Sequence, residues 1–164
     1  MKNLITIVLL IISITSYGQS ELELKIFKYF NEYRMENGLK PLKFDKKVLL
    51  AAQHHNTYLN NNGYPHNYIL DNPHHEKELK YAADRIKYYG TTNFLGSAEC
   101  ILYKFRRYKQ DDNDLLKTAI ESWDNSPSHQ RIMLLDYMDI GAISILELED
   151  DYFIITLNLV SIKN

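Results

Sequence analysis

Two apolar runs near the C-terminus constrain the fold more than any other feature of this sequence. Ile140–Leu148 and Tyr152–Ile162 are rich in isoleucine, leucine and valine, and the polar pair Asp150-Asp151 lies between them. Apolar, β-branched runs separated by a short polar turn are typical of a β-hairpin. A third run, Ala98–Phe105, reads as another strand, on which Glu99 and Cys100 face opposite sides. We expect Thr91–Ser97 before it to be a loop.

The rest of the chain carries helical periodicity. The expected helices run from about Glu21 to Asn37, from Asp45 to about Asn60, from about Glu76 to Tyr88, from Asp111 through Trp123, and from Pro127 to about Leu135. Asp45 and Ser126 are typical N-cap residues, and Gly38 follows the first helix as a C′ residue should. Helices segregated from hairpin strands predict an α+β fold with layers and an antiparallel sheet.

Length and composition suit one small domain. The chain has 164 residues, a net charge of -2 and scattered basic residues, so nothing favours nucleic acid as a partner. Cys100 is its only cysteine, so the fold has no internal disulfide and depends on its core alone. Oligomeric state is not readable from the sequence.

The N-terminus predicts a signal peptide over residues 1–18. Lys2 is followed by an apolar run from Leu4 to Ile14, and Ser16-Tyr17-Gly18 supplies small residues for a peptidase. The run is too short to span a bilayer stably, and no later segment is expected to cross a membrane. We therefore expect an exported protein, in the medium or the periplasm, whose residues 19–164 form a single domain.

Three residues draw attention on chemical grounds. Glu99 lies on an apolar strand, where an ionised carboxylate needs a partner. His129 is the third residue of the short helix after Ser126, where the helix dipole favours neutral imidazole, and His66 follows the end of the second helix. His55 lies on the apolar stripe of that helix and is predicted to be a hydrogen-bonded core histidine.

Several segments together resemble the CAP superfamily of cysteine-rich secretory proteins, antigen 5 and pathogenesis-related 1 proteins. The resemblance rests on Asn31-Glu32-Tyr33-Arg34, Gly38-Leu39-Lys40-Pro41-Leu42, Asp45, Val48, Ala51-Ala52, His55, Trp123 with Ser126-Pro127-Ser128-His129, and Asp139-Ile140-Gly141. It covers essentially the whole chain after the N-terminal segment. It implies a three-layer α-β-α sandwich with a central, mostly antiparallel sheet.

The resemblance also implies a cleft lined by two histidines and two acidic residues. His129 and His66 match the histidines and Glu99 matches the first acid, with His74 in reserve for His66. The position of the second acid falls on Ser126, and the nearby acids Glu121 and Asp124 are out of register. The three matching residues would form either a zinc site with an open position or a hydrogen-bonded network.

Three functions remain open at this point. The first is an extracytoplasmic binding module whose cleft takes a lipid, a sterol or a cell-surface component. The second is a metal-dependent hydrolase or peptidase, in which zinc on His66 and His129 would activate water and Glu99 would act as base or third ligand. The third is a structural protein with a vestigial cleft.

Overall fold

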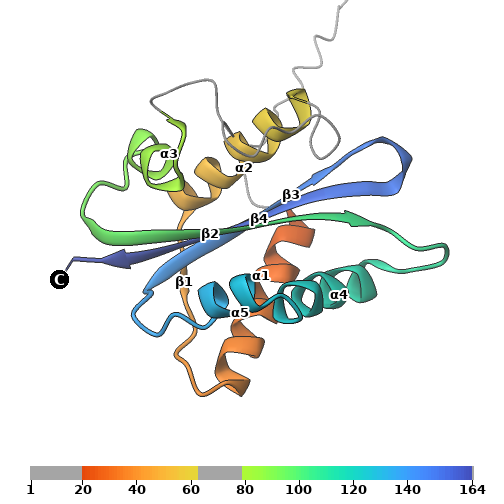
Figure 1. Ribbon diagram of the computed structural model, residues 1–164, viewed down its shortest axis with the longest axis horizontal. Coiled ribbons are helices and arrows are strands. Elements are labelled where there is room, and N and C mark those ends of the chain that lie inside the picture. Colours follow the sequence, from red (N-terminus) through yellow and green to blue (C-terminus); the bar gives the residue numbers. More distant parts are fainter. Residues whose placement is uncertain (1–19, 63–78, 164) are drawn as a thin grey trace, which may run out of the picture.

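A four-stranded sheet lies at the centre of the molecule, with helices on both faces (Figure 1). The computed structural model describes residues 20–62 and 79–163. The helices are α1 (Glu21–Glu36), α2 (Lys46–Asn61), α3 (Ala82–Tyr88), α4 (Asp112–Asp124) and α5 (Pro127–Met133). The strands are β1 (Lys43–Phe44), β2 (Phe94–Phe105), β3 (Ile140–Glu147) and β4 (Tyr152–Ile162). The prediction of a three-layer α-β-α sandwich is confirmed.

The sheet has the strand order β1-β3-β4-β2. β3 and β4 form the antiparallel hairpin that the sequence predicts, in a register that joins Ile140 to Val160 and Glu147 to Phe153. β2 pairs antiparallel with the other edge of β4, and only the short β1 is parallel to its neighbour β3. β4 is therefore an inner strand, and every residue from Phe153 to Ser161 is buried.

Capping interactions fix where the helices begin. Ser20 and Glu23 form a capping box at α1, in which each side chain accepts a hydrogen bond from the backbone of the other. Asp45 caps α2 by accepting from the backbone of Lys47 and Val48, and Asp111 caps α4. α1 ends before Gly38, which has a φ of 75° that suits glycine.

Two boundaries differ from the sequence-based expectation. α3 begins at Ala82, after a turn in which the carbonyls of Leu79 and Lys80 accept hydrogen bonds from the Arg85 guanidinium, while the expected start near Glu76 lies outside the described residues. β2 begins at Phe94, inside the expected loop over Thr91–Ser97, because β4 supplies strand partners as far as Ile162. Tertiary pairing decides both boundaries, and local sequence carries no signal for it.

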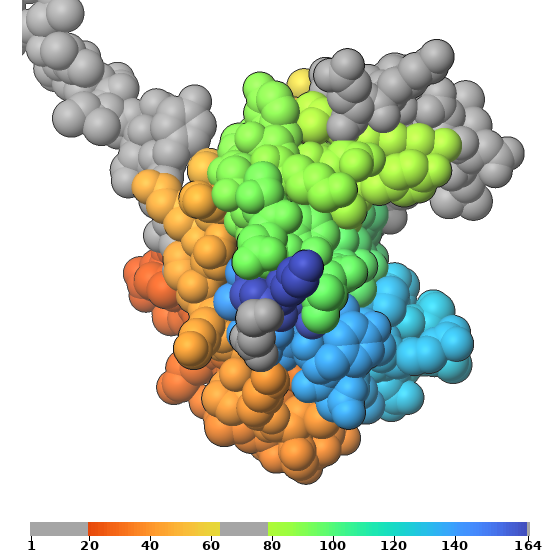
Figure 2. Space-filling view, turned by 90° about the vertical axis from the view of Figure 1, so that its left-hand side faces the viewer, coloured from red at the N-terminus to blue at the C-terminus, as the bar shows by residue number. Residues whose placement is uncertain are grey.

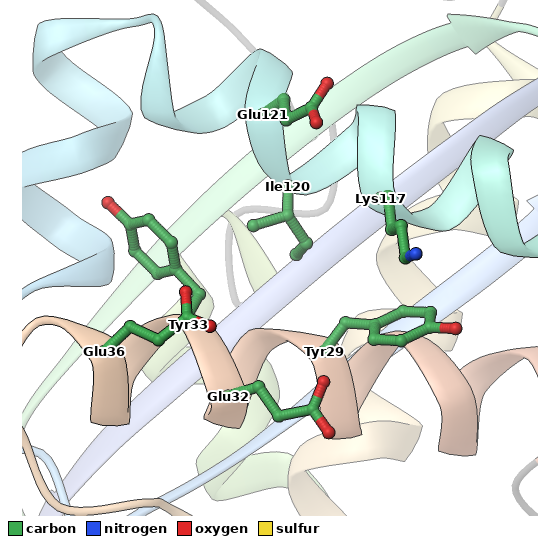
Figure 3. Close-up of a pocket in the computed structure, with 7 residues that line it drawn as sticks. All are labelled: Tyr29, Glu32, Tyr33, Glu36, Lys117, Ile120 and Glu121. Carbon is green, nitrogen blue, oxygen red and sulfur yellow. The ribbon is translucent and has the colours of Figure 1, made fainter.

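The two helical layers have unequal cores. The larger core packs α1, α4 and α5 against one face of the sheet around Trp123, while a smaller cluster joins α2 and α3 to the opposite face. The side view in Figure 2 shows the green α3 and β2 region above the blue C-terminal strands and the orange segment after α1 below them. Between α1 and α4 the surface is hollowed into a groove (Figure 3).

The predicted signal peptide over residues 1–18 lies outside the described residues. Within residues 20–62 and 79–163, no helix combines the length and the apolar composition needed to cross a membrane.

A buried arginine joins α1 to the distant end of α5. Arg34 is completely buried, and its guanidinium donates to the backbone carbonyls of Lys40, Met133 and Leu135 at 3.2, 2.6 and 3.1 Å. These carbonyls lie at the end of α5 and in the loop that leads from α1 to β1. One side chain therefore satisfies acceptors on segments far apart in the sequence.

Replacing this arginine should destabilise the fold strongly. Arg34→Met keeps the aliphatic volume but leaves the carbonyls of Lys40, Met133 and Leu135 without their donor, which should lower the free energy of unfolding by about 3 kcal/mol or more. Urea denaturation measures this. The exposed Arg107, changed to Met as a control, should shift the free energy by no more than about 0.5 kcal/mol. Equal effects of the two changes would contradict the role assigned to Arg34.

Candidate functional site

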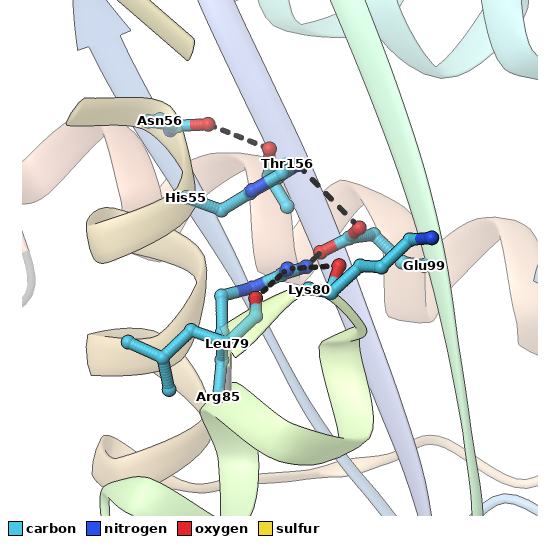
Figure 4. Close-up of polar contacts among 7 residues, drawn as sticks. All are labelled: His55, Asn56, Leu79, Lys80, Arg85, Glu99 and Thr156. Atoms are coloured by element: carbon cyan, nitrogen blue, oxygen red, sulfur yellow. Dashed lines mark hydrogen bonds and ion pairs between the residues drawn. The ribbon is translucent and has the colours of Figure 1, made fainter. Parts of the chain in front are cut away.

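Glu99 lies in the middle of β2 and faces the layer made by α2 and α3. Its cross-strand neighbour on β4 is Asn158. Its Oε2 atom accepts a hydrogen bond from Nη2 of Arg85 on α3 at 2.6 Å, and its Oε1 atom lies 3.6 Å from Nε2 of His55 on α2 (Figure 4). The strand and both helices of this layer therefore meet at one carboxylate.

Arg85 is the partner that the buried carboxylate requires. The residue is completely buried, and its second terminal nitrogen donates to the carbonyls of Leu79 and Lys80. The guanidinium thus fixes the turn before α3 and pairs with Glu99 at the same time. A charged group taken out of water is tolerated in this way when it is paired and hydrogen-bonded.

Burial dominates the electrostatics of the pair. Loss of water contact raises the pKa of Glu99 above its ordinary value, and the positive charge of Arg85 offsets only part of that rise. The Glu99 side chain is 17% exposed, so one edge of it still reaches the surface. The carboxylate is therefore held in place by protein groups and stays accessible from outside.

The polar contacts continue inward beneath α2. Asn56 accepts a hydrogen bond from Thr156 on β4 at 2.6 Å and donates to Ser144 on β3 at 3.1 Å. Asn158 on β4 is also completely buried, yet neither its amide oxygen nor its amide nitrogen has a hydrogen-bond partner among the described residues. A buried amide without partners is expensive, which makes Asn158 the least satisfied polar group that the structure describes on this side of the sheet.

A concave pocket of about 400 Å³ opens over Glu99. It lies at the junction of α2, the start of α3 and the middle of β2. Its lining residues are His55, Lys80, Tyr81, Ala82, Ala83, Ser97, Ala98, Glu99 and Ile101. The walls thus combine small or apolar side chains with one carboxylate, one imidazole, one ammonium, one phenol and one hydroxyl. Pockets of this composition bind small molecules through apolar contact and a few oriented polar groups.

The structure places His129 elsewhere. It lies on α5, and its Nδ1 atom is 2.9 Å from the hydroxyl of Ser126. The thiol of Cys100, which faces away from Glu99, approaches the His129 carbonyl at 3.9 Å. His129 therefore belongs to the layer of α1, α4 and α5, and the structure does not bring it together with Glu99. Burial lowers the pKa of His129 and raises the pKa of Cys100 to about 12.

The remaining predicted residues have separate roles or lie outside the described chain. Asp124 accepts hydrogen bonds from the Tyr33 hydroxyl and the Gln130 amide, and Glu121 lines the groove between α1 and α4. His66 and His74 fall outside the described residues. Ser126 is the N-cap residue of α5 but makes no side-chain hydrogen bond to the helix backbone, and its hydroxyl contacts the His129 ring instead.

The described residues do not fit a zinc site at Glu99. Of the three predicted ligands, Glu99 and His129 lie on opposite faces of the sheet. The carboxylate is already paired with the Arg85 guanidinium, a fixed cation that opposes a metal ion at the same oxygen. Within residues 20–62 and 79–163, no three histidine, cysteine, aspartate or glutamate side chains are grouped to hold a metal.

Sequence reasoning missed two members of the site. The pattern predicts His55 as a core histidine, and it is only 1% exposed, but its ring also faces the pocket carboxylate. Its position on the buried stripe of α2, beside a sheet that carries Glu99, is the signal that could have found it. Arg85 gives no such signal, because a single arginine on a short helix is usually solvated.

The family model of CAP, the cysteine-rich secretory protein family, matches residues 27–159. This chain belongs to the CAP family. The match includes every described residue of the site around Glu99. No curated protein matches this CAP chain.

Solved structures confirm the CAP fold. An outer surface protein of Borrelia burgdorferi superposes with a TM-score of 0.69 at 19% identity, over 89% of this chain and 96% of that one. An extracellular protein with an SCP domain from Bacillus anthracis gives a TM-score of 0.63 at 19% identity, over 85% of this chain and 40% of that one. The CAP domain of Enterococcal PrgA gives 0.57 at 16% identity, over 92% and 65%. This CAP chain thus spans less than half of the Bacillus protein.

The contributions of Arg85 and Glu99 to the free energy of unfolding should be coupled. Arg85→Met removes the hydrogen-bonded guanidinium from the buried Glu99 and should lower the free energy of unfolding by about 3 kcal/mol. Adding Glu99→Leu to that variant removes the unpaired charge and should cost little more, or regain part of the loss. Urea denaturation of the two single variants and the double variant measures the coupling. Strictly additive losses would show that Arg85 and Glu99 act independently.

His129 should make stability sensitive to acid. Because burial lowers its pKa in the folded state, the unfolded chain binds more protons once the pH falls below about 6.5. The contribution of the neutral ring is complete above that pH and is lost as the pH falls through the lowered folded-state pKa. His129→Gln should therefore lose less free energy of unfolding than the parent between about pH 7 and pH 5. Identical pH profiles of the free energy of unfolding for His129→Gln and the parent would rule this out. Ser128→Ala, a change in the same helix that keeps His129, is the control and should follow the parent.

Proposed function

We propose that this CAP-domain protein is an exported binding module whose ligand occupies the pocket over Glu99. The observation that carries the proposal is the geometry of Glu99 itself, a carboxylate oriented by Arg85 and His55 at the base of a pocket of about 400 Å³. Polar groups already fixed before binding lose little entropy when a ligand arrives. Burying these polar groups lowers the stability of the free protein, but it fixes them in the positions that orient the ligand.

Export is supported by the sequence pattern of residues 1–18 and by what the proteins with similar structures are. The Borrelia protein is an outer surface protein, the Bacillus protein is extracellular, and a similar protein of Staphylococcus aureus is a cysteine-rich secretory protein. A partner at the cell surface, or a small molecule in the surrounding medium, would be the accessible ligand for such a protein.

The pocket favours a ligand with an apolar body and a polar end. Ala82, Ala83 and Ile101 provide apolar contact, while Glu99 and Lys80 offer opposite charges. A lipid or sterol hydroxyl would meet this description, since it can donate to the Glu99 carboxylate. Hydrolysis is the weaker proposal, because Glu99 and His129 lie on opposite faces of the sheet and the described residues do not assemble a zinc site.

Blocking the pocket tests the proposal. Lipid and cell-wall extracts of the source cells are fractionated and added to the purified protein, and the midpoint of thermal unfolding is recorded. A fraction that contains the ligand at about one hundred times its Kd should raise the midpoint by about 5 °C or more. Ala83→Trp, which fills the pocket, should abolish that shift.

Leu95→Trp is the matched control, because Leu95 is 72% exposed on the same strand β2, outside the pocket. It adds a ring of the same size and should keep the full shift. If no fraction protects the parent protein, or if Ala83→Trp is protected as well as the parent, the pocket over Glu99 is not the binding site.

A further inference from the structure

Asn158 on β4 is a buried polar side chain whose hydrogen bonds the fold does not account for. It is completely buried, and neither end of its amide has a hydrogen-bond partner among the described residues. A primary amide can donate two hydrogen bonds and accept two, so burying one that makes none is costly. Such a residue lowers the stability of the free protein unless another molecule completes its hydrogen bonds.

The neighbouring polar residues show that this deficit is local. Asn56 is also buried, and its amide oxygen accepts a hydrogen bond from Thr156 at 2.6 Å (Figure 4). Its amide nitrogen donates to the Ser144 hydroxyl at 3.1 Å and to the Ile154 carbonyl at 3.3 Å. Thr156 and Asn158 lie on the same face of β4, because side chains alternate along a strand. One buried amide beneath α2 therefore has partners at both ends, and the other has none.

The strand register places Asn158 beside the pocket carboxylate. Asn158 is the cross-strand neighbour of Glu99 on β2. Residues directly opposite each other on antiparallel strands have Cβ atoms about 5 Å apart, on the same face of the sheet. The amide therefore lies one strand inward from Glu99, which lines the pocket of about 400 Å³. The pocket and the amide without partners are adjacent parts of one site.

Glu99 and Arg85 have unused hydrogen-bonding positions next to this amide. Arg85 donates to Oε2 of Glu99, whereas Oε1 accepts no hydrogen bond from a described residue and lies 3.6 Å from Nε2 of His55. Nε of Arg85 is buried and also lacks a partner among the described residues. The base of the site thus offers acceptors on Glu99 and Asn158 and donors on Asn158 and Arg85.

The charges around the amide limit which chemical group can fill the site. A carboxylate would be repelled by Glu99, and an ammonium group would be repelled by Arg85. An uncharged group avoids both penalties, because Glu99 and Arg85 already neutralise each other. A hydroxyl is uncharged, and its single oxygen both donates and accepts hydrogen bonds. It can therefore pair with an acceptor and a donor of this site at the same time.

We propose that Asn158 determines the specificity of the pocket over Glu99, by binding the hydroxyl group of an uncharged ligand between its amide and the Glu99 carboxylate. This inference rests on the function proposed for that pocket and adds the ligand class, a neutral alcohol with an apolar body. The apolar body would lie against Ala82, Ala83 and Ile101. The amide lacks partners in the free protein because the ligand supplies them.

Thermal unfolding of the free protein tests this role without any ligand. Asn158→Leu keeps a branched side chain and removes the amide without partners, so it should raise the midpoint of unfolding by about 3 °C. Asn158→Val repeats the change with a smaller side chain, in case leucine overfills the site. Asn56→Leu is the matched control and should lower the midpoint, because it breaks the three hydrogen bonds of a satisfied amide. If both variants of Asn158 lower the midpoint, the amide is already satisfied in the free protein and the proposal is overturned.

Titration with cyclohexanol, followed by heteronuclear NMR, tests the ligand class. The side-chain amide signals of Asn158, identified by their absence in Asn158→Leu, should shift and saturate, while those of Asn56 stay in place. Cyclohexanecarboxylate and cyclohexylammonium carry the same ring and should bind about tenfold more weakly. The proposal is overturned if either charged probe binds as tightly as cyclohexanol, or if cyclohexanol does not saturate.

Two variants separate this proposal from the function on which it rests, with affinities taken from backbone amide shifts. Asn158→Leu and Ala83→Trp should both weaken cyclohexanol binding about tenfold or more, and Leu95→Trp should not. If Ala83→Trp binds as the parent does, the pocket is not the binding site and both proposals fail. If Ala83→Trp loses binding but Asn158→Leu keeps it, the pocket stands and only the role of Asn158 is overturned.

Discussion

The burial of β4 on both faces is the constraint on which the rest of the structure depends. A strand with nothing but buried residues from Phe153 to Ser161 needs a partner strand on each edge and a layer of helices on each face. β2 and β3 provide the partners, and the two helical layers provide the cover. The three-layer architecture therefore follows from one strand, and the helix caps and Arg34 fix how the covering elements meet it.

The two faces of β4 are chemically different. Phe153, Ile155, Leu157 and Leu159 enter the large apolar core with α1, α4 and α5. On the opposite face Thr156 donates a hydrogen bond to Asn56 of α2, and Asn158 lies beside its cross-strand neighbour Glu99. Polar groups in a buried layer reduce stability unless they are all satisfied. Their concentration on one face therefore separates the apolar core from the layer that carries the proposed binding pocket.

Local patterns predicted what local physics determines. The hairpin, the helices that begin after Asp45 and Asp111, and the opposite facing of Glu99 and Cys100 were readable because caps and alternation depend on neighbours in sequence. The family resemblance added the layer architecture. The site was readable only in part, since Glu99 was found but His55 and Arg85 gain their roles through contacts across the fold. The layer to which His129 belongs could not be predicted either, because it is set by how α5 packs on the sheet and not by the sequence motif around His129.

The unequal cores set a hierarchy of local stability. The layer of α2 and α3 has a smaller apolar cluster, and α3 is a helix of about two turns held by the buried residues Arg85 and Ile86. A segment with little apolar burial opens at a fraction of the cost of global unfolding. We therefore expect the backbone amides of α3 to exchange with solvent sooner than those of β4. A ligand bound to Glu99 would therefore stabilise the layer of α2 and α3 without any rearrangement of the layer of α1, α4 and α5.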